Sequence, residues 1–397
     1  MKSFTKLVIL LILSLPYFLG SCTKDEFNTE GVSAALPSFL SNYANTENTS
    51  AVKIKADLSN PVKDAWIKED IKFGHHTSVL IENEFIYTPL EDGIAKVNRK
   101  NGTIIWSLDL DELSRGNMAI DGNIIYASAD EIFYAIDKNS GSILWSKDLQ
   151  HPIFTAPLIV GNNVLINDTY GIVYAFDKTA GDVRWWYEIT SGTYGSAMVR
   201  NENKVFIASS NGEIHCLDIN SGKKIWVFDQ TCTSSSCPII NTPLIVSGSN
   251  ILFGNVSGNV FSVNFDGSLA WQYKHSSRIY FKGAALSNNN LVLTGTDGNK
   301  GERTICVDIN SKSLLWQYDN GSQNKISLPM IANDRFVLIG SSKGLNNIDI
   351  LTGKLIWNKS IKMASGYVKN QCLSNIAITD LDIVYTTSDG KLVRFVY

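Results

Sequence analysis

The chain has 397 residues, of which 44% are hydrophobic and 18% charged, and its formal net charge is −3. This balance is typical of a folded globular protein and argues against an intrinsically disordered chain. The sequence has no long basic run, which argues against nucleic acid or an anionic membrane surface as the main partner.

Residues 1–21 have the pattern of a secretory signal peptide. Lys2 and Lys6 precede an apolar run over residues 7–19, which is too short for a convincing membrane span. The stretch Leu19-Gly20-Ser21-Cys22 then resembles the lipobox of bacterial lipoproteins. This resemblance implies that Cys22 is lipidated and becomes the new N-terminus. The alternative is an ordinary signal peptide followed by a cysteine by chance.

The residues after Cys22 bear on localisation. Thr23, not Asp, follows the cysteine, so the familiar inner-membrane retention signal is absent. We therefore expect a protein that is lipid-anchored in the outer membrane and faces either the periplasm or the cell surface. Residues 22–60 are rich in Ser, Asn, Thr and Glu and are interpreted as a polar tether between lipid and domain.

Tryptophan recurs along the rest of the chain at intervals of 39 to 45 residues, which indicates an internal repeat. Each unit holds four short β-type runs, separated by turn residues such as Asp-Gly and Asn-Ser-Gly, and shows no convincing helical period. Four strands in about 40 residues are the signature of a propeller blade. The recurring residues are Trp66, Trp106, Trp145, Trp185, Trp226, Trp271, Trp316 and Trp357; Trp186 lies outside the series.

The repeat has a core pattern, Ala-x-Asp-x-x-x-Gly-x-x-x-Trp, which is complete from Ala135 to Trp145. The Asp and Gly are expected to bracket a tight turn, because Asp accepts backbone N–H bonds and Gly adopts a positive φ. The small first residue, which is Cys216 or Cys306 in two units, allows a neighbouring sheet to approach closely. The tryptophans are expected to fill the wedges between blades, so we interpret all eight as structural.

Counting the units closes a ring of eight. Residues 375–396 contain three strand-like runs with no tryptophan strand after them, whereas Trp66 has no matching strands before it. The segment around Trp66 can therefore supply the fourth strand of the last blade. The predicted fold is all-β: an eight-bladed β-propeller over residues 61–397, with four-stranded antiparallel blades and an N-terminal strand that completes the last blade.

The core pattern resembles the tryptophan-docking motif of pyrroloquinoline-quinone-type propellers, and the chain lacks the Gly-His and Trp-Asp pairs of WD40 repeats. The resemblance covers residues 61–397 and implies the propeller fold. The lipidation signal, the eight expected blades and the chain length together resemble the BamB family of propeller lipoproteins. This second resemblance implies a scaffold near the outer-membrane machinery that assembles β-barrel proteins.

Two further cysteines, Cys232 and Cys237, lie close together in a polar stretch. In an oxidising compartment they can form a local disulfide, which contributes about 2 kcal/mol. Metal binding is the alternative, but no His or further Cys lies at ligand spacing. We therefore predict a disulfide and no metal site.

The sequence contains none of the common catalytic motifs. It has no Gly-x-Ser-x-Gly elbow, no His-Glu-x-x-His helix motif and no phosphate-binding glycine-rich signature. Quinone-dependent dehydrogenases share the repeat, but they are usually much longer and carry an adjacent Cys-Cys pair, which is missing here. The pair His75-His76 fits a solvated loop better than a metal site. We expect no enzyme activity and no cofactor.

Propellers usually function through the loops at one face. The loops that lead from each tryptophan strand into the next blade share one rim, and aromatic and basic residues are enriched there. Because Tyr and Arg are favoured at binding hot spots, we predict partner-binding anchors in these loops. The alternative is that these aromatic side chains only plug the central channel. The candidate anchors are Tyr194, Arg278, Tyr280, Lys282 and Tyr367.

Three functions fit the sequence. The first is a non-catalytic scaffold in outer-membrane protein assembly, with a protein partner. The second is a propeller that binds a glycan or another small ligand, for example beside an uptake complex. The third is a quinone-dependent or metal-dependent oxidoreductase.

Overall fold

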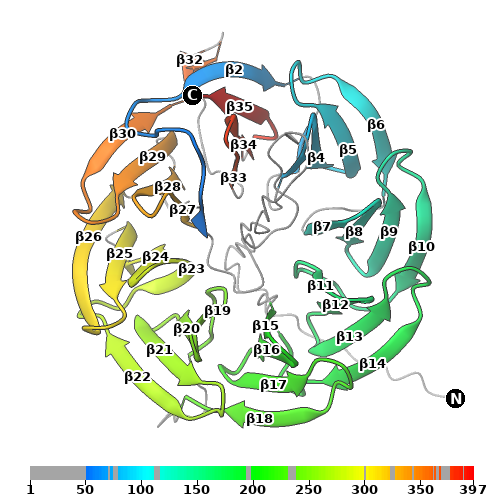
Figure 1. Ribbon diagram of the computed structural model, residues 1–397, viewed down its shortest axis with the longest axis vertical. Coiled ribbons are helices and arrows are strands. Elements are labelled where there is room, and N and C mark those ends of the chain that lie inside the picture. Colours follow the sequence, from blue (N-terminus) through cyan, green and yellow to red (C-terminus); the bar gives the residue numbers. More distant parts are fainter. Residues whose placement is uncertain are drawn as a thin grey trace, which may run out of the picture.

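The computed structural model describes residues 51–397, except for residues 70–71, 75–78, 111–116, 194–197, 231–237, 299–300, 322–326, 342–343, 361, 364–365, 368–375 and 388. Regular secondary structure in the described residues consists of β-strands. Eight sheets are arranged radially in a closed ring (Figure 1), and a separate two-stranded hairpin lies between the last two. The predicted eight-bladed propeller is confirmed.

The first four blades follow one another along the chain, and within each blade consecutive strands pair antiparallel. The inner strands are buried almost continuously, because neighbouring blades cover both faces of each sheet. The strands are β3 (Leu80–Glu82), β4 (Phe85–Leu90), β5 (Gly93–Asn98) and β6 (Ile104–Asp109); β7 (Met118–Asp121), β8 (Ile124–Ala129), β9 (Ile132–Asp137) and β10 (Ile143–Asp148); β11 (Leu158–Val160), β12 (Asn163–Asn167), β13 (Ile172–Asp177) and β14 (Val183–Glu188); and β15 (Val199–Asn201), β16 (Lys204–Ala208), β17 (Ile214–Asp218) and β18 (Lys224–Phe228).

Blades five to seven continue the same order, and the hairpin β31–β32 connects blade seven to blade eight. The strands are β19 (Ile245–Ser247), β20 (Asn250–Gly254), β21 (Asn259–Asn264) and β22 (Leu269–Lys274); β23 (Tyr280–Ser287), β24 (Asn290–Thr296), β25 (Glu302–Asp308) and β26 (Ser313–Gly321); β27 (Met330–Ala332), β28 (Phe336–Ser341), β29 (Gly344–Asp349) and β30 (Leu355–Lys359); and β31 (Lys362–Met363) and β32 (Gly366–Tyr367).

Blade eight is built from both ends of the described chain. Its sheet has the order β2-β35-β34-β33, in which β2 (Lys63–Lys68) pairs antiparallel with β35 (Leu392–Val396). The other members are β33 (Ala377–Ile378) and β34 (Asp382–Thr386). Trp66 lies opposite Arg394, and Figure 1 shows β2 outside β35 at the rim of the ring. The predicted closure by an N-terminal strand is therefore confirmed.

The recurring tryptophans bridge neighbouring blades. In seven of the eight, the indole N–H donates to a backbone carbonyl, as between Trp145 and Lys178 (3.3 Å) or Trp316 and Ile350 (2.6 Å). The acceptor belongs to the next blade in six cases, and for Trp357 it is Leu58, ahead of β2. In six of these the acceptor directly follows the conserved turn position of the pattern, such as Asp177 before Lys178. The repeat thus builds a hydrogen-bonded joint between blades as well as an apolar wedge.

The glycine of the pattern serves the same joint. A Cβ atom on Gly222 would lie 2.5 Å from the indole of Trp185, which belongs to the preceding blade. Gly222 also has a φ of +69°, which favours glycine. The same indole contact recurs at Gly102, Gly141, Gly181, Gly267 and Gly353.

The joint between blades five and six departs from this arrangement. Lys312 takes the place of the glycine and still has a positive φ of 57°. Among the described residues, the indole N–H of Trp271, which faces this joint, has no hydrogen-bond acceptor. Among the described residues, the joint that lacks the tryptophan hydrogen bond is therefore the one where Lys312 replaces the glycine of the pattern.

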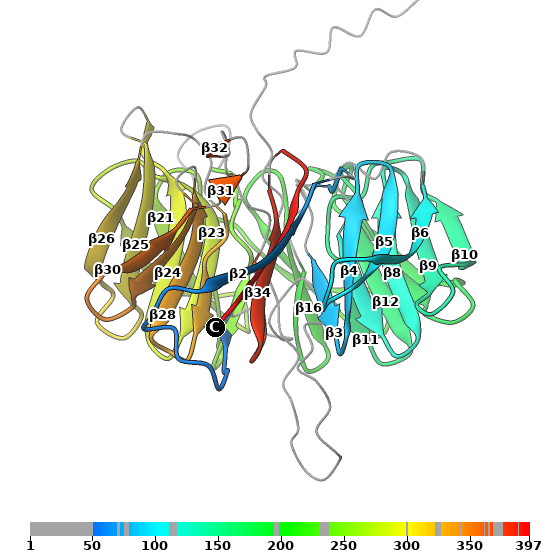
Figure 2. The same ribbon diagram turned by 90° about the horizontal axis from the view of Figure 1, so that it is seen from above.

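Residues 51–60, which the sequence analysis placed in the tether, contact blade seven. The short strand β1 (Ala51–Val52) pairs parallel with β27 near the centre of the ring. The chain then crosses the blade to reach β2 at the rim (Figures 1 and 2). Leu58 is fully buried, and its carbonyl accepts the indole N–H of Trp357 at 2.7 Å. Residues ahead of position 61 therefore pack on the propeller as well.

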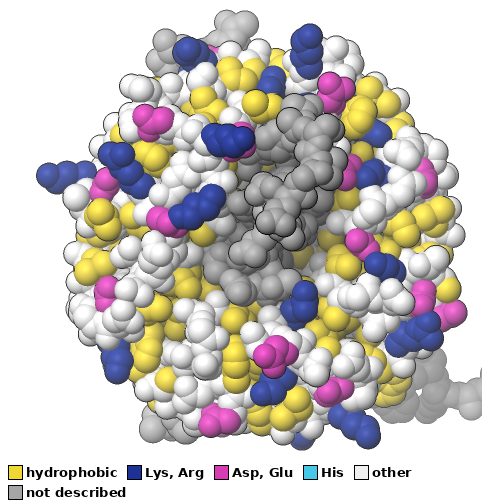
Figure 3. Space-filling model, in the orientation of Figure 1, with side chains coloured by type: hydrophobic (Ala, Val, Ile, Leu, Met, Phe, Trp, Pro, Cys, Tyr) yellow, Lys and Arg dark blue, Asp and Glu magenta, His cyan; other side chains and the backbone are white. Residues whose placement is uncertain are grey.

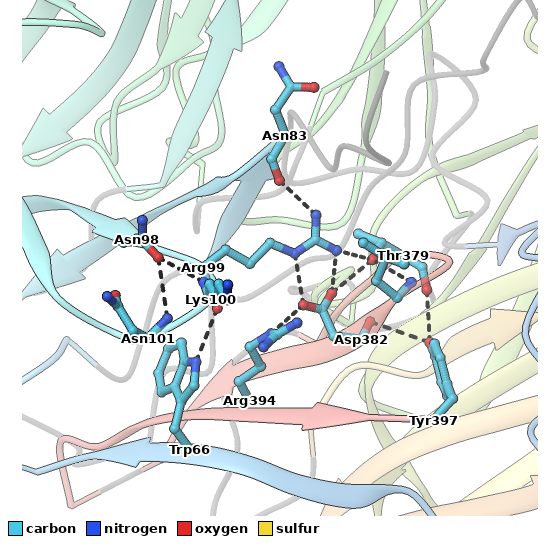
Figure 4. Close-up of polar contacts among 11 residues, drawn as sticks. Trp66, Asn83, Asn98, Arg99, Lys100, Asn101, Thr379, Asp382, Arg394 and Tyr397 are labelled. Carbon is cyan, nitrogen blue, oxygen red and sulfur yellow. Dashed lines mark hydrogen bonds and ion pairs between the residues drawn. The ribbon is translucent and has the colours of Figure 1, made fainter. Parts of the chain in front are cut away.

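A buried ion-pair network joins blade one to blade eight. Asp382 is fully buried and accepts hydrogen bonds from Arg99 (Nε 2.8 Å, Nη2 2.6 Å) and from Arg394 (Nε 2.6 Å) (Figure 4). Thr379 donates to the same carboxylate at 2.8 Å. Burial alone raises the pKa of Asp382, but the bonds and charges of the two arginines outweigh it and hold the pKa below its usual value.

The two cysteines that replace Ala in the pattern lie in the core. Cys216 and Cys306 are free and buried, opposite Trp226 and Trp316 on the outer strands. Burial raises the pKa of each thiol to about 12, so both remain protonated and unreactive. Their role in the structure is packing between blades.

Candidate functional site

The loops between blades and the loops between the second and third strands of each blade meet at one end of the ring. This end, here called the loop face, follows from the antiparallel order, because the fourth strand of one blade runs toward the end where the next blade starts. The hairpin β31–β32 and the end of β26 stand at this face (Figure 2). The predicted anchors belong to these loops or to the strand ends beside them.

Two of the five predicted anchors contact each other. The guanidinium of Arg278 lies 5.0 Å from the ring centre of Tyr280, a cation–π arrangement at the start of blade six. The Arg278 side chain is exposed and that of Tyr280 is half-buried. An exposed Arg on a Tyr ring offers a planar donor group and an aromatic edge, the combination that protein interfaces favour.

The third anchor, Lys282, lies on the same strand, where β23 has a bulge between Phe281 and Gly283. Its positive charge acts on Glu302, a fully buried residue that begins β25. Burial raises the pKa of Glu302 to about 8, and the charge of Lys282 lowers it only in part. The sequence analysis did not identify Glu302, because nothing in its local sequence distinguishes it from an exposed turn residue.

The other predicted sites are not brought to this cluster by the described structure. Tyr367 lies on β32 opposite Lys362, in the connection between blades seven and eight, and its side chain is outside the described residues. Tyr194 lies outside the described residues altogether. So do Cys22 and the cysteine pair Cys232 and Cys237, together with His75-His76, so the lipidation and the disulfide stay predictions.

A second aromatic pair on the loop face was missed by the sequence analysis. The ring of His151, from the loop between blades two and three, stacks on Tyr170 with ring centres 4.0 Å apart. Tyr170 is 66% exposed and therefore presents a bare aromatic surface. Beside it, Asp168 is buried, and burial raises its pKa although a backbone bond from Ile172 opposes the shift. Tyr187 and His215, which are 28 residues apart in the sequence, likewise meet only after folding.

The described surface of the opposite face carries charges of both signs (Figure 3). Figure 3 looks onto the side that residues 53–62 cross, and its described surface mixes Lys and Arg with Asp and Glu. Such a mixture produces no large field of one sign for steering a charged partner. This favours the loop face as the candidate interface.

No three or more His, Cys, Asp and Glu side chains gather in a group suited to a metal ion in the part of the chain that the structure describes. Within the same residues, no helix is long and apolar enough to cross a membrane.

The fold and its joints define a class: a tryptophan-docked, eight-bladed propeller that presents aromatic and basic loops at one face. Comparison with known families is more specific. The family described as outer membrane protein assembly factor BamB matches residues 63–263 and 210–392. The chain belongs to this family.

Individual relatives are distant. Outer membrane protein assembly factor BamB of Yersinia pestis is 24% identical over 207 residues, which cover 49% of this chain and 49% of that protein. The chain is thus aligned with only about half the length of this relative. The crystal structure of BamB from Moraxella catarrhalis has a TM-score of 0.69 at 14% identity, covering 85% of this chain and all of that one.

A propeller enzyme is similarly close in fold. Quinohemoprotein alcohol dehydrogenase from Comamonas testosteroni has a TM-score of 0.76 at 13% identity, covering 91% of this chain and 81% of that chain. Likeness at this identity shows the propeller fold and carries no information about activity. The family assignment therefore rests on the sequence match.

Proposed function

We propose that this chain is a non-catalytic, lipid-anchored scaffold in outer-membrane β-barrel protein assembly, and that it holds a protein partner at its loop face. Membership in the BamB family is the observation that carries the proposal. The lipobox-like stretch ending in Cys22 supports an outer-membrane anchor, with the propeller facing the periplasm or the cell surface. The domain division is proposed accordingly: signal peptide 1–21, tether from residue 22, and propeller to residue 397.

The loop face supports protein binding through the contact between Arg278 and Tyr280. The two side chains hold each other in place at 5.0 Å, so less side-chain entropy is lost when a partner packs on them. Substitution of both by alanine is expected to weaken partner binding by tenfold or more, since paired Arg and Tyr residues are typical hot spots.

Affinity purification of the full-length chain from solubilised membranes tests the proposal. Recovery of a β-barrel insertase with the wild-type chain, and its loss with the Arg278→Ala/Tyr280→Ala double variant, is the expected result. Arg184→Ala is the matched control, because Arg184 is exposed on the outer strand β14. If the double variant retains every partner that the control retains, the loop-face assignment is refuted.

A second candidate is the binding of a glycan or another small ligand. The exposed ring of Tyr170, stacked on His151, is the observation that favours it, because sugar rings pack on exposed aromatic faces. Recovery of an uptake porin or a bound glycan in the same purification, without an insertase, would replace the scaffold by this function. Tyr170→Ala then removes ligand binding, as measured by a glycan array.

A quinone-dependent oxidoreductase is the remaining candidate, because quinone-dependent dehydrogenases share the tryptophan repeat of this chain. Its test is the absorbance of the purified chain after addition of quinone and calcium. A quinone band that stays with the protein after gel filtration would support an enzyme, and its absence supports the non-catalytic scaffold.

A further inference from the structure

Glu302 is unusual among the buried charged residues of this propeller. Its side chain has 0% exposure, and neither carboxylate oxygen has a hydrogen-bond partner among the described residues. Asp382, which is also fully buried, is by contrast held by two arginines and a threonine. A buried ionised carboxylate is strongly unfavourable unless a proton or a positive charge compensates it. The charge of Lys282 compensates Glu302 only in part.

Neighbouring side chains on the same face of the sheet also present unused oxygens. Thr296 lies directly opposite Glu302 across β24 and β25, so their Cβ atoms are about 5 Å apart. Its hydroxyl is buried and has no partner among the described residues. Asn320 lies beside Gly321, the partner of Glu302 on β26, and its amide nitrogen donates to Thr304 at 2.8 Å. Its amide oxygen is left buried and without a donor.

These oxygens lie on the side of blade six that packs against blade seven. Thr304 lies two residues beyond Glu302 on the same side of β25, and Cys306 follows in the apolar cluster shared with blade seven. Next to them, Thr294 donates to the carbonyl of Ser327, at the entrance to blade seven. Arg303 points to the other side of the sheet, where its Nη1 lies 2.6 Å from Asp319, and it does not neutralise Glu302.

We infer that the interface between blades six and seven at the loop face binds a hard divalent cation, held by oxygens of Glu302, Thr296 and Asn320. The donor set consists only of oxygens: two from a carboxylate, one hydroxyl and one amide carbonyl. Calcium accepts six to eight such ligands in irregular geometry and completes its shell with water, whereas magnesium demands a near-ideal octahedron.

The site lies beside the proposed partner surface, since Lys282, one of the predicted anchors, acts electrostatically on Glu302. Its oxygens come from β24, β25 and β26, the second to fourth strands of one blade. Only one of its three residues is acidic, so it differs from the clusters of three or more His, Cys, Asp and Glu that are absent from the described residues. The cation would compensate a buried carboxylate within the fold, whether or not a partner binds the loop face.

The test is a calcium titration of the full-length lipid-free chain after treatment with chelator, at pH 8, followed by isothermal calorimetry and by thermal unfolding. Wild-type protein is expected to bind one calcium ion and to unfold at a higher temperature with calcium than without. Glu302→Gln has the same shape and no charge to bury, so it is expected to fold and to lose the calcium response. Thr296→Val is expected to weaken calcium binding about tenfold, since it removes one ligand.

Glu131→Gln is the matched control. Glu131 precedes Ala135 by four residues in blade two, as Glu302 precedes Cys306 in blade six, but Glu131 is partly exposed. This variant is expected to bind calcium like the wild type. The inference is overturned if the wild-type chain shows no calcium binding at 10 mM, or if Glu302→Gln binds as tightly as wild type. An equal response to magnesium would overturn the preference for calcium.

Discussion

Replacement of Asp382 by asparagine tests the joint that closes the ring. The change keeps the shape of the side chain but removes its charge, so Arg99 and Arg394 lose their common counter-ion. Arg99 is 3% exposed, and it bonds the carboxylate through two nitrogens as well as the carbonyl of Asn83. Removing one partner of a buried pair costs about 3–5 kcal/mol, because the remaining charge stays buried.

The free energy of unfolding, measured by guanidinium denaturation and tryptophan fluorescence, is the readout. Glu91→Gln is the control, because Glu91 pairs with Lys72 at 3.1 Å on the surface, with both side chains more than half exposed. Such a pair contributes less than about 1 kcal/mol. The pH dependence follows from the lowered pKa: Asp382 stabilises the fold above its unfolded pKa of 3.8, and this contribution is lost as pH falls toward the lower folded pKa. If Asp382→Asn costs no more than Glu91→Gln, blade eight is not held by this network.

Three further predictions concern stability. With chelator present, the free energy of unfolding should fall by on the order of 5 kcal/mol as pH rises from 4.5 to about 8, because the folded state disfavours the ionised form of Glu302. In denaturation curves, the Glu302→Gln variant should lose this pH dependence. Lys312→Gly should stabilise the protein by about 0.5–1 kcal/mol, because glycine adopts the positive φ at this position without strain. Gly222→Ala should destabilise it by about 1–3 kcal/mol, because the added methyl group overlaps an indole. If both variants changed the free energy of unfolding in the same direction, the account of the joint given above would be wrong. Trp185→Ala should cost about 3–5 kcal/mol, but Trp186→Ala, at a residue 61% exposed, should change stability by less than about 1 kcal/mol; equal losses in melting experiments would refute the distinction between the two indoles.

The architecture was predictable because each blade repeats the same short sequence pattern. Tryptophan spacing predicted the blade count, and the unmatched runs at the two ends predicted the composite blade. The pattern did not reveal why its glycine recurs: the indole that excludes a Cβ atom comes from another blade, some 40 residues away in sequence. Nor did it reveal that the carbonyl of Leu58 accepts the hydrogen bond of Trp357, a contact 299 residues apart.

The candidate sites were less predictable for the same reason. The contact between Arg278 and Tyr280 lies within three residues, and the composition of the loop was enough to select both. The oxygens around Glu302 come from three strands, so their meeting depends on sheet register and on which side chains the next blade covers. Likewise, Arg99 and Asp382 are 283 residues apart, and neither lies in a sequence motif that indicates a buried ion pair.

The composite last blade has a consequence for how the chain is made. Synthesis runs from the N-terminus, so β2 emerges more than 300 residues before β35, the only strand of its sheet that it pairs with. Until then β2 has no partner strand in its sheet, and an unpaired strand is prone to aggregate and to pair with other chains. Contacts of such long sequence separation also form slowly. The synthesis of β35 therefore decides whether β2 is secured, and a truncation that removes β35 would leave the ring open between blades seven and one.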